Sequence, residues 1–281
     1  MNTAKRSLLF TPANRPSAFE KALGTGADII CLDLEDAVPP DQKAASRDQA
    51  IAFLSTAGPA GVTRCLRING LSSRAGLEDL VAVAKAAPAQ GMIMLPKVGE
   101  AAELRLADAI LSEAGSGLEL AALVETLDGL ENVSDIARAT GRLKLIMFGA
   151  VDFSAELGTP NAEGPLSYAR GRIVHAAKRA GIDVMDVPEL NFRNTDVIAS
   201  SAVRARDSGF TGKAAIHPAG IALINETFTP SAEEIAHAQR VIAAFEAAPN
   251  GLAVLDGQLV EAPVIKAMQR RLAIAQTCGL L

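Results

Sequence analysis

The sequence has no tryptophan, one tyrosine and only 4% aromatic residues, and it contains no block of basic residues. Its formal net charge is -5. Proteins that bind nucleic acid usually present a basic surface, and those that bind single strands add aromatic rings on which bases stack. Anionic membrane surfaces likewise attract clusters of Lys and Arg. Neither nucleic acid nor a membrane is therefore expected as a partner.

The chain also lacks the cysteine and histidine patterns of metal sites. Its three cysteines, Cys31, Cys65 and Cys278, have no metal-ligand spacing, and it has only three histidines. Cys31 and Cys65 fall inside apolar runs, so we expect both to be small buried hydrophobic residues. The first apolar run, residues 7–10, is too short for a signal peptide or a membrane span. A reducing, cytoplasmic location is expected.

Nucleotide-binding motifs are missing as well. The first predicted strand is not followed by Gly-x-Gly-x-x-Gly, and no Gly-Lys-Ser of a phosphate-binding loop occurs. What the chain has in quantity is apolar residues, at 49% over 281 residues. This composition predicts a large buried core, either in two ordinary domains or in one large α/β barrel.

Short apolar runs alternate with Ala-rich segments of helical spacing, and many of those segments end at a glycine. Eight runs are predicted as strands: residues 6–11, 28–33, 63–68, 91–96, 119–125, 144–150, 183–188 and 212–216. Helices are predicted at residues 16–23, 41–54, 77–86, 101–113, 130–139, 165–179, 196–207 and 218–225. Eight strand–helix units predict a (β/α)8, or TIM, barrel over residues 1–228, with a doubly wound open sheet as the alternative.

Residues 229–281 exceed what a barrel needs. A helix is predicted at 231–248 and an amphipathic helix at 263–275, which makes this part a C-terminal helical extension. Two arrangements are open: the extension caps the barrel mouth as a lid, or it packs on a neighbouring subunit.

Nearly every predicted strand ends on an ionisable or polar side chain. In a barrel these ends meet at one rim, where active sites lie. The residues are Arg15, Asp33, Glu35, Asp36, Arg67, Asn69, Lys97, Glu125, Asp152, Glu189, Asn191 and His217. Structural roles compete for some of them: helix capping for Asp33, Glu35, Asp36 and His217, and a solvated strand end for Lys97.

Glu125 and Asp152 each close a buried run, so neighbouring strands would place both carboxylates side by side. An oxygen-only pair suits Mg²⁺, which takes its remaining ligands from water and substrate. The competing interpretation is two salt bridges, to Arg67 and Lys97. A metal, the Arg67 guanidinium and backbone N–H groups of Gly149, Ala150 and Val151 would together stabilise an enolate of an oxygen-rich substrate such as a 2-keto acid.

Several segments resemble the citrate lyase β-subunit-like branch of the HpcH/HpaI aldolase family, and the resemblance covers almost the whole chain. They are residues 6–16, the Leu-Asp-Leu-Glu-Asp-Ala-Val block within 26–38, Leu66 to Asn69, Leu95 to Lys97, Glu125 and Phe148 to Asp152. The resemblance implies a (β/α)8 barrel, a homotrimer or hexamer, and Mg²⁺-dependent chemistry on β-hydroxyacyl thioesters such as malyl-CoA, citramalyl-CoA or citryl-CoA. Mn²⁺ is the alternative ion.

The resemblance also implies roles for individual residues. Glu125 and Asp152 resemble the metal ligands, and Glu35 and Asp36 the acids that hold metal-bound waters. Arg67 resembles the residue that grips the keto acid and stabilises the enolate. The phosphates of coenzyme A would meet Arg15 and Lys21.

The tail departs from the family in one place. Malyl-CoA and citramalyl-CoA enzymes carry an Asp before the Pro of the tail, offered to a neighbouring active site as acid/base, whereas this chain has Glu261 before Ala262-Pro263. Four hypotheses follow: a stand-alone acyl-CoA lyase or synthase, a citrate lyase subunit that takes its thioester from an acyl carrier protein, a Schiff-base aldolase using Lys97 or Lys213, and a non-catalytic binding protein.

Overall fold

The computed structural model describes residues 4–56, 58–248 and 252–281. The chain divides into two compact units, residues 5–225, and Ala4 with residues 226–281. This division falls within helix α10 (Ile221–Phe228), slightly before the predicted boundary between residues 228 and 229. Within the described residues, no helix has the length and apolar character needed to cross a membrane.

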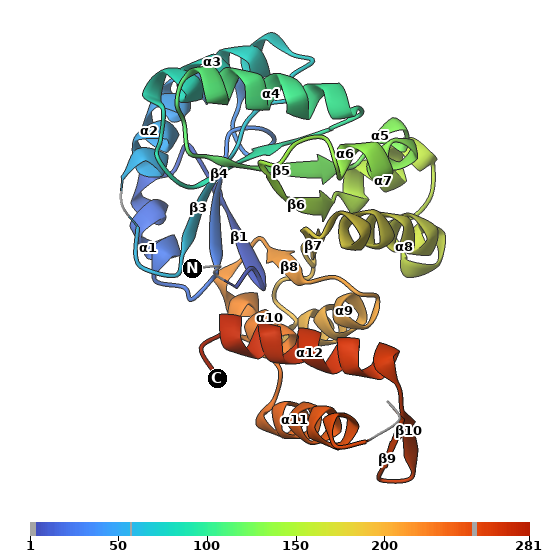
Figure 1. Cartoon of the computed structure of the whole chain (residues 1–281). Coiled ribbons are helices and arrows are strands. Elements are labelled where there is room, and N and C mark those ends of the chain that lie inside the picture. Colours follow the sequence, from blue (N-terminus) through green and yellow to red (C-terminus); the bar gives the residue numbers. More distant parts are fainter. Residues whose placement is uncertain (1–3, 57, 249–251) are drawn as a thin grey trace. The chain divides into compact units, whose positions relative to one another are not determined.

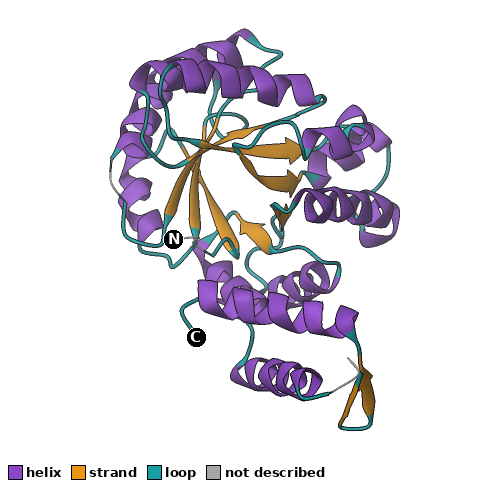
Figure 2. Cartoon of the chain, viewed as in Figure 1, coloured by secondary structure: helices purple, strands orange, loops and turns teal. Residues whose placement is uncertain are grey.

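The first unit is a closed barrel of eight parallel strands in sequential order, with helices around it (Figures 1 and 2). The strands are β1 (Ser7–Pro12), β2 (Ile29–Asp33), β3 (Thr63–Arg67), β4 (Met92–Leu95), β5 (Glu119–Val124), β6 (Leu143–Phe148), β7 (Asp183–Asp186) and β8 (Gly212–Ala215). Each lies within two residues of its predicted ends, and β8 pairs with β1 to close the ring. The predicted (β/α)8 fold is confirmed, and the open-sheet alternative is wrong.

The helices between the strands follow the prediction with two exceptions. The single helix expected at residues 130–139 is two short helices, Leu127–Glu131 and Val133–Ile136, and the helix Ala150–Leu157 was not expected. The helices are α1 (Phe19–Leu23), α2 (Lys43–Ser55), α3 (Arg74–Ala86), α4 (Ala101–Glu113), α5 (Leu127–Glu131), α6 (Val133–Ile136), α7 (Ala150–Leu157), α8 (Glu163–Ala180) and α9 (Thr195–Asp207). Helix α7 was not predicted, because the apolar run of β6 continues through Ala150 and conceals the change of period at Gly149.

Apolar side chains fill the interior of the barrel. Every second residue of each strand points inward. The core cluster contains Leu8, Ile29, Cys31, Cys65, Met92, Met94, Ala121, Leu123, Leu145, Met147, Met185 and Ala214. Cys31 and Cys65 are buried free thiols in this cluster, as predicted. Asp33, Arg67 and Glu125 each lie two positions after a core residue. The same alternation therefore points them inward, at the rim above the core.

The second unit is not purely helical. Helices α11 (Ala232–Glu246) and α12 (Ala262–Thr277) enclose a hairpin of β9 (Ala253–Leu255) and β10 (Gln258–Val260), and Val241, Val260 and Ile265 form its core. The two-residue turn is Asp256-Gly257, with φ of 51° and 79°. Asp-Gly with both φ angles positive is typical of a tight hairpin. Both predicted helices of the extension are therefore present, and the chain between them forms a hairpin that its turn dipeptide signals.

A buried polar cluster fixes the loop between β2 and α2 at the rim of the barrel. Asp79 is fully buried and accepts hydrogen bonds from the backbone N–H and the side-chain amide of Asn69 (2.9 and 2.6 Å) and from Nε of Arg47 (2.6 Å). Nζ of Lys43 then links Asn69 to the carbonyl oxygens of Leu34 and Glu35, at 2.8 Å each. One carboxylate on α3 thus fixes the loop that follows β2.

We predict that Asp79→Ala lowers the free energy of unfolding by about 3–5 kcal/mol, because it leaves the N–H groups of Asn69 without an acceptor and leaves the largely buried Arg47 with only the partly exposed Glu78 as a partner. The matched control is Glu78→Ala on the same helix. Glu78 pairs with Arg47 at 3.3 Å, but its side chain is 44% exposed, so its loss should cost at most about 1 kcal/mol. Urea unfolding of both variants checks the difference, and equal losses would contradict it.

Candidate active site

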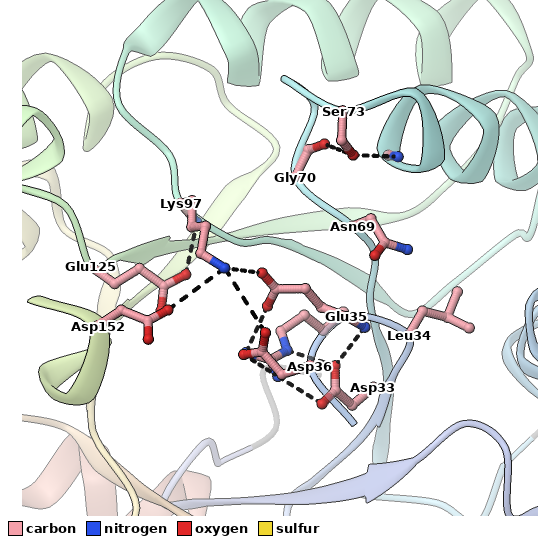
Figure 3. A network of polar contacts seen from close by, with 12 residues as sticks. Asp33, Leu34, Glu35, Asp36, Asn69, Gly70, Ser73, Lys97, Glu125 and Asp152 are labelled. Carbon is pink, nitrogen blue, oxygen red and sulfur yellow. Dashed lines mark hydrogen bonds and ion pairs between the residues drawn. The ribbon is translucent and has the colours of Figure 1, made fainter. Parts of the chain in front are cut away.

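Carboxylates from three loops gather with two cations at the carboxyl ends of β2 to β6 (Figure 3). The residues involved are Asp33, Glu35, Asp36, Arg67, Lys97, Glu125 and Asp152. Five acids thus face two bases. Because like charges repel strongly where water is excluded, this excess of negative charge favours binding of a further cation.

Asp33, the last residue of β2, organises the loop that carries the next two acids. Its Oδ1 accepts the backbone N–H of Glu35 at 2.9 Å, and its Oδ2 accepts that of Ala37 at 3.3 Å. Its carboxylate is buried. Asp33 therefore has a structural role, but it does not cap the following helix as considered: it fixes the loop that carries Glu35.

Arg67, at the end of β3, is held by acids on several sides. Its Nε and Nη2 form a two-point hydrogen-bonded pair with Asp33 at 2.7 and 2.6 Å, and Nη1 lies 3.1 Å from Oε2 of Glu35. The guanidinium also lies 5.1 Å from the ring centroid of Phe10. The planar fork is thus occupied by Asp33, so a keto acid would meet the remaining N–H groups. In the described residues the ion pairs of Arg67 involve neither Glu125 nor Asp152.

Glu125 follows β5 directly and is only 4% exposed. Its Oε1 accepts the backbone N–H of Lys97 at 2.9 Å. Burial, aided by the negative charges of Glu35 and Asp152, raises the pKa of Glu125 to about 8. A divalent cation would reverse this cost, because it replaces the missing hydration of the ionised carboxylate.

Glycine at position 149 makes room for that carboxylate. A Cβ built on Gly149 would lie 2.4 Å from Oε2 and 2.5 Å from Cβ of Glu125, closer than real atoms approach. The backbone N–H of Gly149 donates to the carbonyl oxygen of Val124 at 3.0 Å, so the expectation that this N–H binds substrate is wrong. Ala150 and Val151 lie in the first turn of α7, where a helix leaves N–H groups available to a ligand.

Asp152 does not end a strand as predicted. Strand β6 stops at Phe148, and Asp152 lies in the first turn of α7 with its side chain 40% exposed. Figure 3 shows its carboxylate beside Glu125 on the same side of the rim. The expected pairing of the two acids therefore arises from a strand end and a helix start.

Lys97 is more central to the cluster than a solvated strand-end lysine, the role considered for it from the sequence. It has a left-handed backbone, with φ of 53°, and its Nζ lies 2.5 Å from Glu35, 3.7 Å from Asp152 and 3.9 Å from Asp36. Burial opposes its charge, but the hydrogen bond and the charge of Glu35 outweigh burial and raise the pKa of Lys97 above its ordinary value. The available signal was its position directly after the buried β4 run.

Other predicted residues are not brought into this cluster. Arg15 and Lys21 are exposed, Arg15 before a short 3-10 turn and Lys21 in the last turn of α1. Glu261 belongs to the second unit, where it is exposed immediately before α12. The roles of these three residues stay predictions. Lys213 is fully buried and its Nζ contacts Asp186 at 2.8 Å and the Val187 carbonyl at 2.6 Å, which leaves it poorly placed for a Schiff base.

The donor set fits a hard divalent cation with few protein ligands. Within the described ranges, no cluster of three or more His, Cys, Asp or Glu side chains is arranged to hold a metal ion. Glu125 and Asp152 therefore offer two carboxylates, and water or substrate oxygens would complete six-fold coordination. Mg²⁺ characteristically binds in this way, through one or two carboxylates with several waters retained.

Comparison with known proteins fixes the family. The model of the HpcH/HpaI aldolase/citrate lyase family matches residues 6–218, which include all of the rim acids and both cations. The chain belongs to this family. It is accordingly a carbon–carbon lyase.

Individual relatives cover nearly the whole chain. An L-malyl-CoA/beta-methylmalyl-CoA lyase of Cereibacter sphaeroides is 35% identical, over 93% of this chain and 91% of its own. A (3S)-malyl-CoA thioesterase of the same species is 37% identical, over 96% and 94%. The protein CitE of Mycobacterium tuberculosis, solved with magnesium, acetoacetate and coenzyme A, is 30% identical over 97% and 98%, with a TM-score of 0.81.

We predict that Gly149→Ala disrupts the site, because the new Cβ must displace the Glu125 side chain. Overpacking of this kind should lower the free energy of unfolding by about 1–3 kcal/mol, and Mg²⁺ binding measured by calorimetry should be lost. The control is Gly171→Ala on α8, where a Cβ meets no atom within 4 Å and a helical alanine should stabilise by about 0.5–1 kcal/mol. Unchanged Mg²⁺ binding in Gly149→Ala would refute the close-approach argument.

We also predict that Mg²⁺ binding displaces a proton from Glu125. A raised pKa means that the folded protein keeps this proton up to about pH 8, whereas a metal ligand must be ionised. Apparent affinity should therefore rise with pH and level off above about 8. Calorimetry in two buffers of different ionisation enthalpy measures the released proton directly. Affinity that is independent of pH, with no proton release, would contradict the assignment, and Glu125→Gln should show no release.

Proposed function

We propose that this protein is a Mg²⁺-dependent lyase that cleaves, or forms, a β-hydroxyacyl-CoA thioester such as malyl-CoA, citramalyl-CoA or citryl-CoA. The products of cleavage are acetyl-CoA and a 2-keto acid, which is glyoxylate from malyl-CoA, pyruvate from citramalyl-CoA or oxaloacetate from citryl-CoA. The observation that carries the proposal is the buried Glu125 carboxylate beside Asp152 at the rim (Figure 3), in a cluster that also contains Arg67, which Asp33 holds in place. Mn²⁺ is the alternative ion.

The names of the relatives support the same substrate class. Lyase and thioesterase relatives of Cereibacter sphaeroides act on malyl-CoA by name, and the Mycobacterium tuberculosis relative binds magnesium, acetoacetate and coenzyme A. Each match extends over at least 93% of this chain. A thioester between coenzyme A and a hydroxy acid is therefore the substrate that we expect.

The side chains at the rim divide the work of cleavage. Glu125 and Asp152 would hold the cation, which would supply positive charge to polarise the substrate oxygens and to offset the charge that develops as the carbon–carbon bond breaks. The N–H groups of Arg67 that Asp33 leaves free bind the carboxylate of the keto acid and face the developing enolate. The first-turn N–H groups of Ala150 and Val151 add further donors.

Glu35 and Asp36 would orient water around the cation and accept protons there. Burial raises the pKa of Glu35, although Arg67 and Lys97 oppose the shift. Acid/base exchange at the hydroxyl group is assigned to Glu261 of the tail, in the place of the family's Asp. Arg15 and Lys21 would bind the coenzyme A phosphates, and a homotrimer or hexamer in the cytoplasm is the expected form.

Hydrolysis is the second candidate, because the thioesterase relatives are as similar to this chain as the lyase relatives. The two reactions break different bonds in malyl-CoA. A lyase breaks a carbon–carbon bond and releases glyoxylate and acetyl-CoA, whereas a thioesterase breaks the carbon–sulfur bond and releases malate and a free thiol. Product identity therefore separates them without reference to structure.

We predict Mg²⁺-dependent release of keto acid from one of malyl-CoA, citramalyl-CoA or citryl-CoA, and loss of that release with EDTA. A phenylhydrazine assay measures the keto acid, and a thiol reagent measures free coenzyme A. Asp152→Ala should abolish turnover and Mg²⁺ binding, since one of two carboxylate ligands is lost. The control is Asp135→Ala on α6, which removes an exposed acid paired only with its helix neighbour Arg138 among the described residues.

The other outcomes have definite meanings. Free thiol without keto acid would replace the lyase by the thioesterase. Metal binding without turnover on any free coenzyme A ester would favour the acyl carrier protein as the thioester donor, as in a citrate lyase subunit. Full activity in Asp152→Ala would refute the metal assignment, and bound ligand with no turnover on either kind of thioester would favour the non-catalytic protein.

A further inference from the structure

Lys97 interacts with both proposed metal ligands. Its backbone N–H donates to Oε1 of Glu125 at 2.9 Å, and its ammonium lies 3.7 Å from Oδ2 of Asp152. The same ammonium hydrogen-bonds Oε1 of Glu35 at 2.5 Å and lies 3.9 Å from Asp36 (Figure 3). The positive charge of Lys97 therefore lies among the carboxylates that would surround a metal.

The two cations of the rim differ in freedom. The guanidinium of Arg67 is 11% exposed and fixed by the two-point pair with Asp33. The side chain of Lys97 is 44% exposed, and its ammonium is a point charge on a flexible four-carbon stem. Only Lys97 is thus built to change its partner without disturbing the barrel.

We propose that Lys97 is a resident counter-cation: it holds the acids together in the metal-free protein and releases Asp152 when Mg²⁺ binds. The inference rests on the proposed metal site at Glu125 and Asp152. An ammonium within 4 Å of Asp152 would repel an ion bound to that carboxylate. It therefore turns fully to Glu35, which already accepts its shortest hydrogen bond.

The proposed exchange of partners and the alternative, a purely structural role for Lys97, predict opposite effects on Mg²⁺ affinity when the Lys97 charge is removed. If Lys97 competes with the metal, removal of its charge leaves more negative charge for Mg²⁺ and tightens binding. If Lys97 only organises the acids, its removal lets them move apart and weakens binding. The direction of the change, rather than its size, separates a counter-cation from a merely structural residue.

Turnover should change in the other direction. Without the ammonium, Glu35 and Asp36 repel each other. Their carboxylates then leave the positions beside Arg67 from which they would orient the groups bound to the metal. A misplacement of about 1 Å in such a site is enough to reduce the rate roughly 100-fold. Lys97 is thus a positioning residue, and its loss should combine tighter Mg²⁺ binding with a lower kcat.

The test is calorimetric titration of Mg²⁺ into the full-length parent and three variants. Lys97→Met and Lys97→Gln remove the charge and should bind Mg²⁺ on the order of tenfold more tightly, as expected for a partly exposed charge. Lys97→Arg keeps the charge and should bind with an affinity close to that of the parent. Lys144→Met is the control, because Lys144 is an exposed residue at the start of β6, at the opposite end of that strand.

Thermal unfolding in EDTA and in Mg²⁺ gives a second readout. Lys97→Met should melt below Lys144→Met in EDTA, because its acids repel, and should gain more from Mg²⁺ than the parent does. Equal or weaker Mg²⁺ binding by both uncharged variants would overturn the inference. Absence of Mg²⁺ binding by the parent protein would instead overturn the proposed metal site, so the two failures are distinguishable.

Discussion

The burial of the Glu125 carboxylate is the constraint on which the rest of the site depends. A carboxylate that is 4% exposed must find hydrogen bonds or a cation, or keep its proton. One N–H from Lys97 satisfies one oxygen, and the missing side chain of Gly149 leaves space for the other. The end of β5, the loop after β4 and the residue that precedes α7 are therefore adapted to a single acidic group.

The remaining charges form a fixed part and an adjustable part. Asp33 binds Arg67 at two points and also accepts the N–H groups of the following loop, so this pair cannot move without loss of several bonds. Below it, Asp79 and Asn69 anchor the same loop through Lys43. Catalysis needs such preorganised donors, because reorientation during the reaction would consume the stabilisation that they provide. Lys97, by contrast, has a flexible side chain between several acids.

Much of the fold could be predicted from the sequence, because parallel strands buried on both faces are apolar throughout and are easily recognised. Helix α7 was missed for the same reason: its first residues are apolar, so the change at Gly149 left no mark in hydrophobicity. The hairpin between the two predicted helices of the tail also had a signal, Asp256-Gly257, but its two strands of three residues each are too short to show a period. Periodicity thus locates long elements well and short ones poorly.

The sequence predicted which residues lie at the site better than it predicted which of them pair with one another. Strand ends nominate Arg67, Glu125 and Lys97, but only the closed barrel shows that Arg67 pairs with Asp33 and that Lys97 lies among four acids. Partner choice depends on tertiary geometry that a strand-end rule does not contain. It also matters for function: an arginine already paired with an acid presents fewer donors to substrate. At the proposed metal site, a cation held by Glu125 and Asp152 would then supply much of the positive charge that an enolate requires.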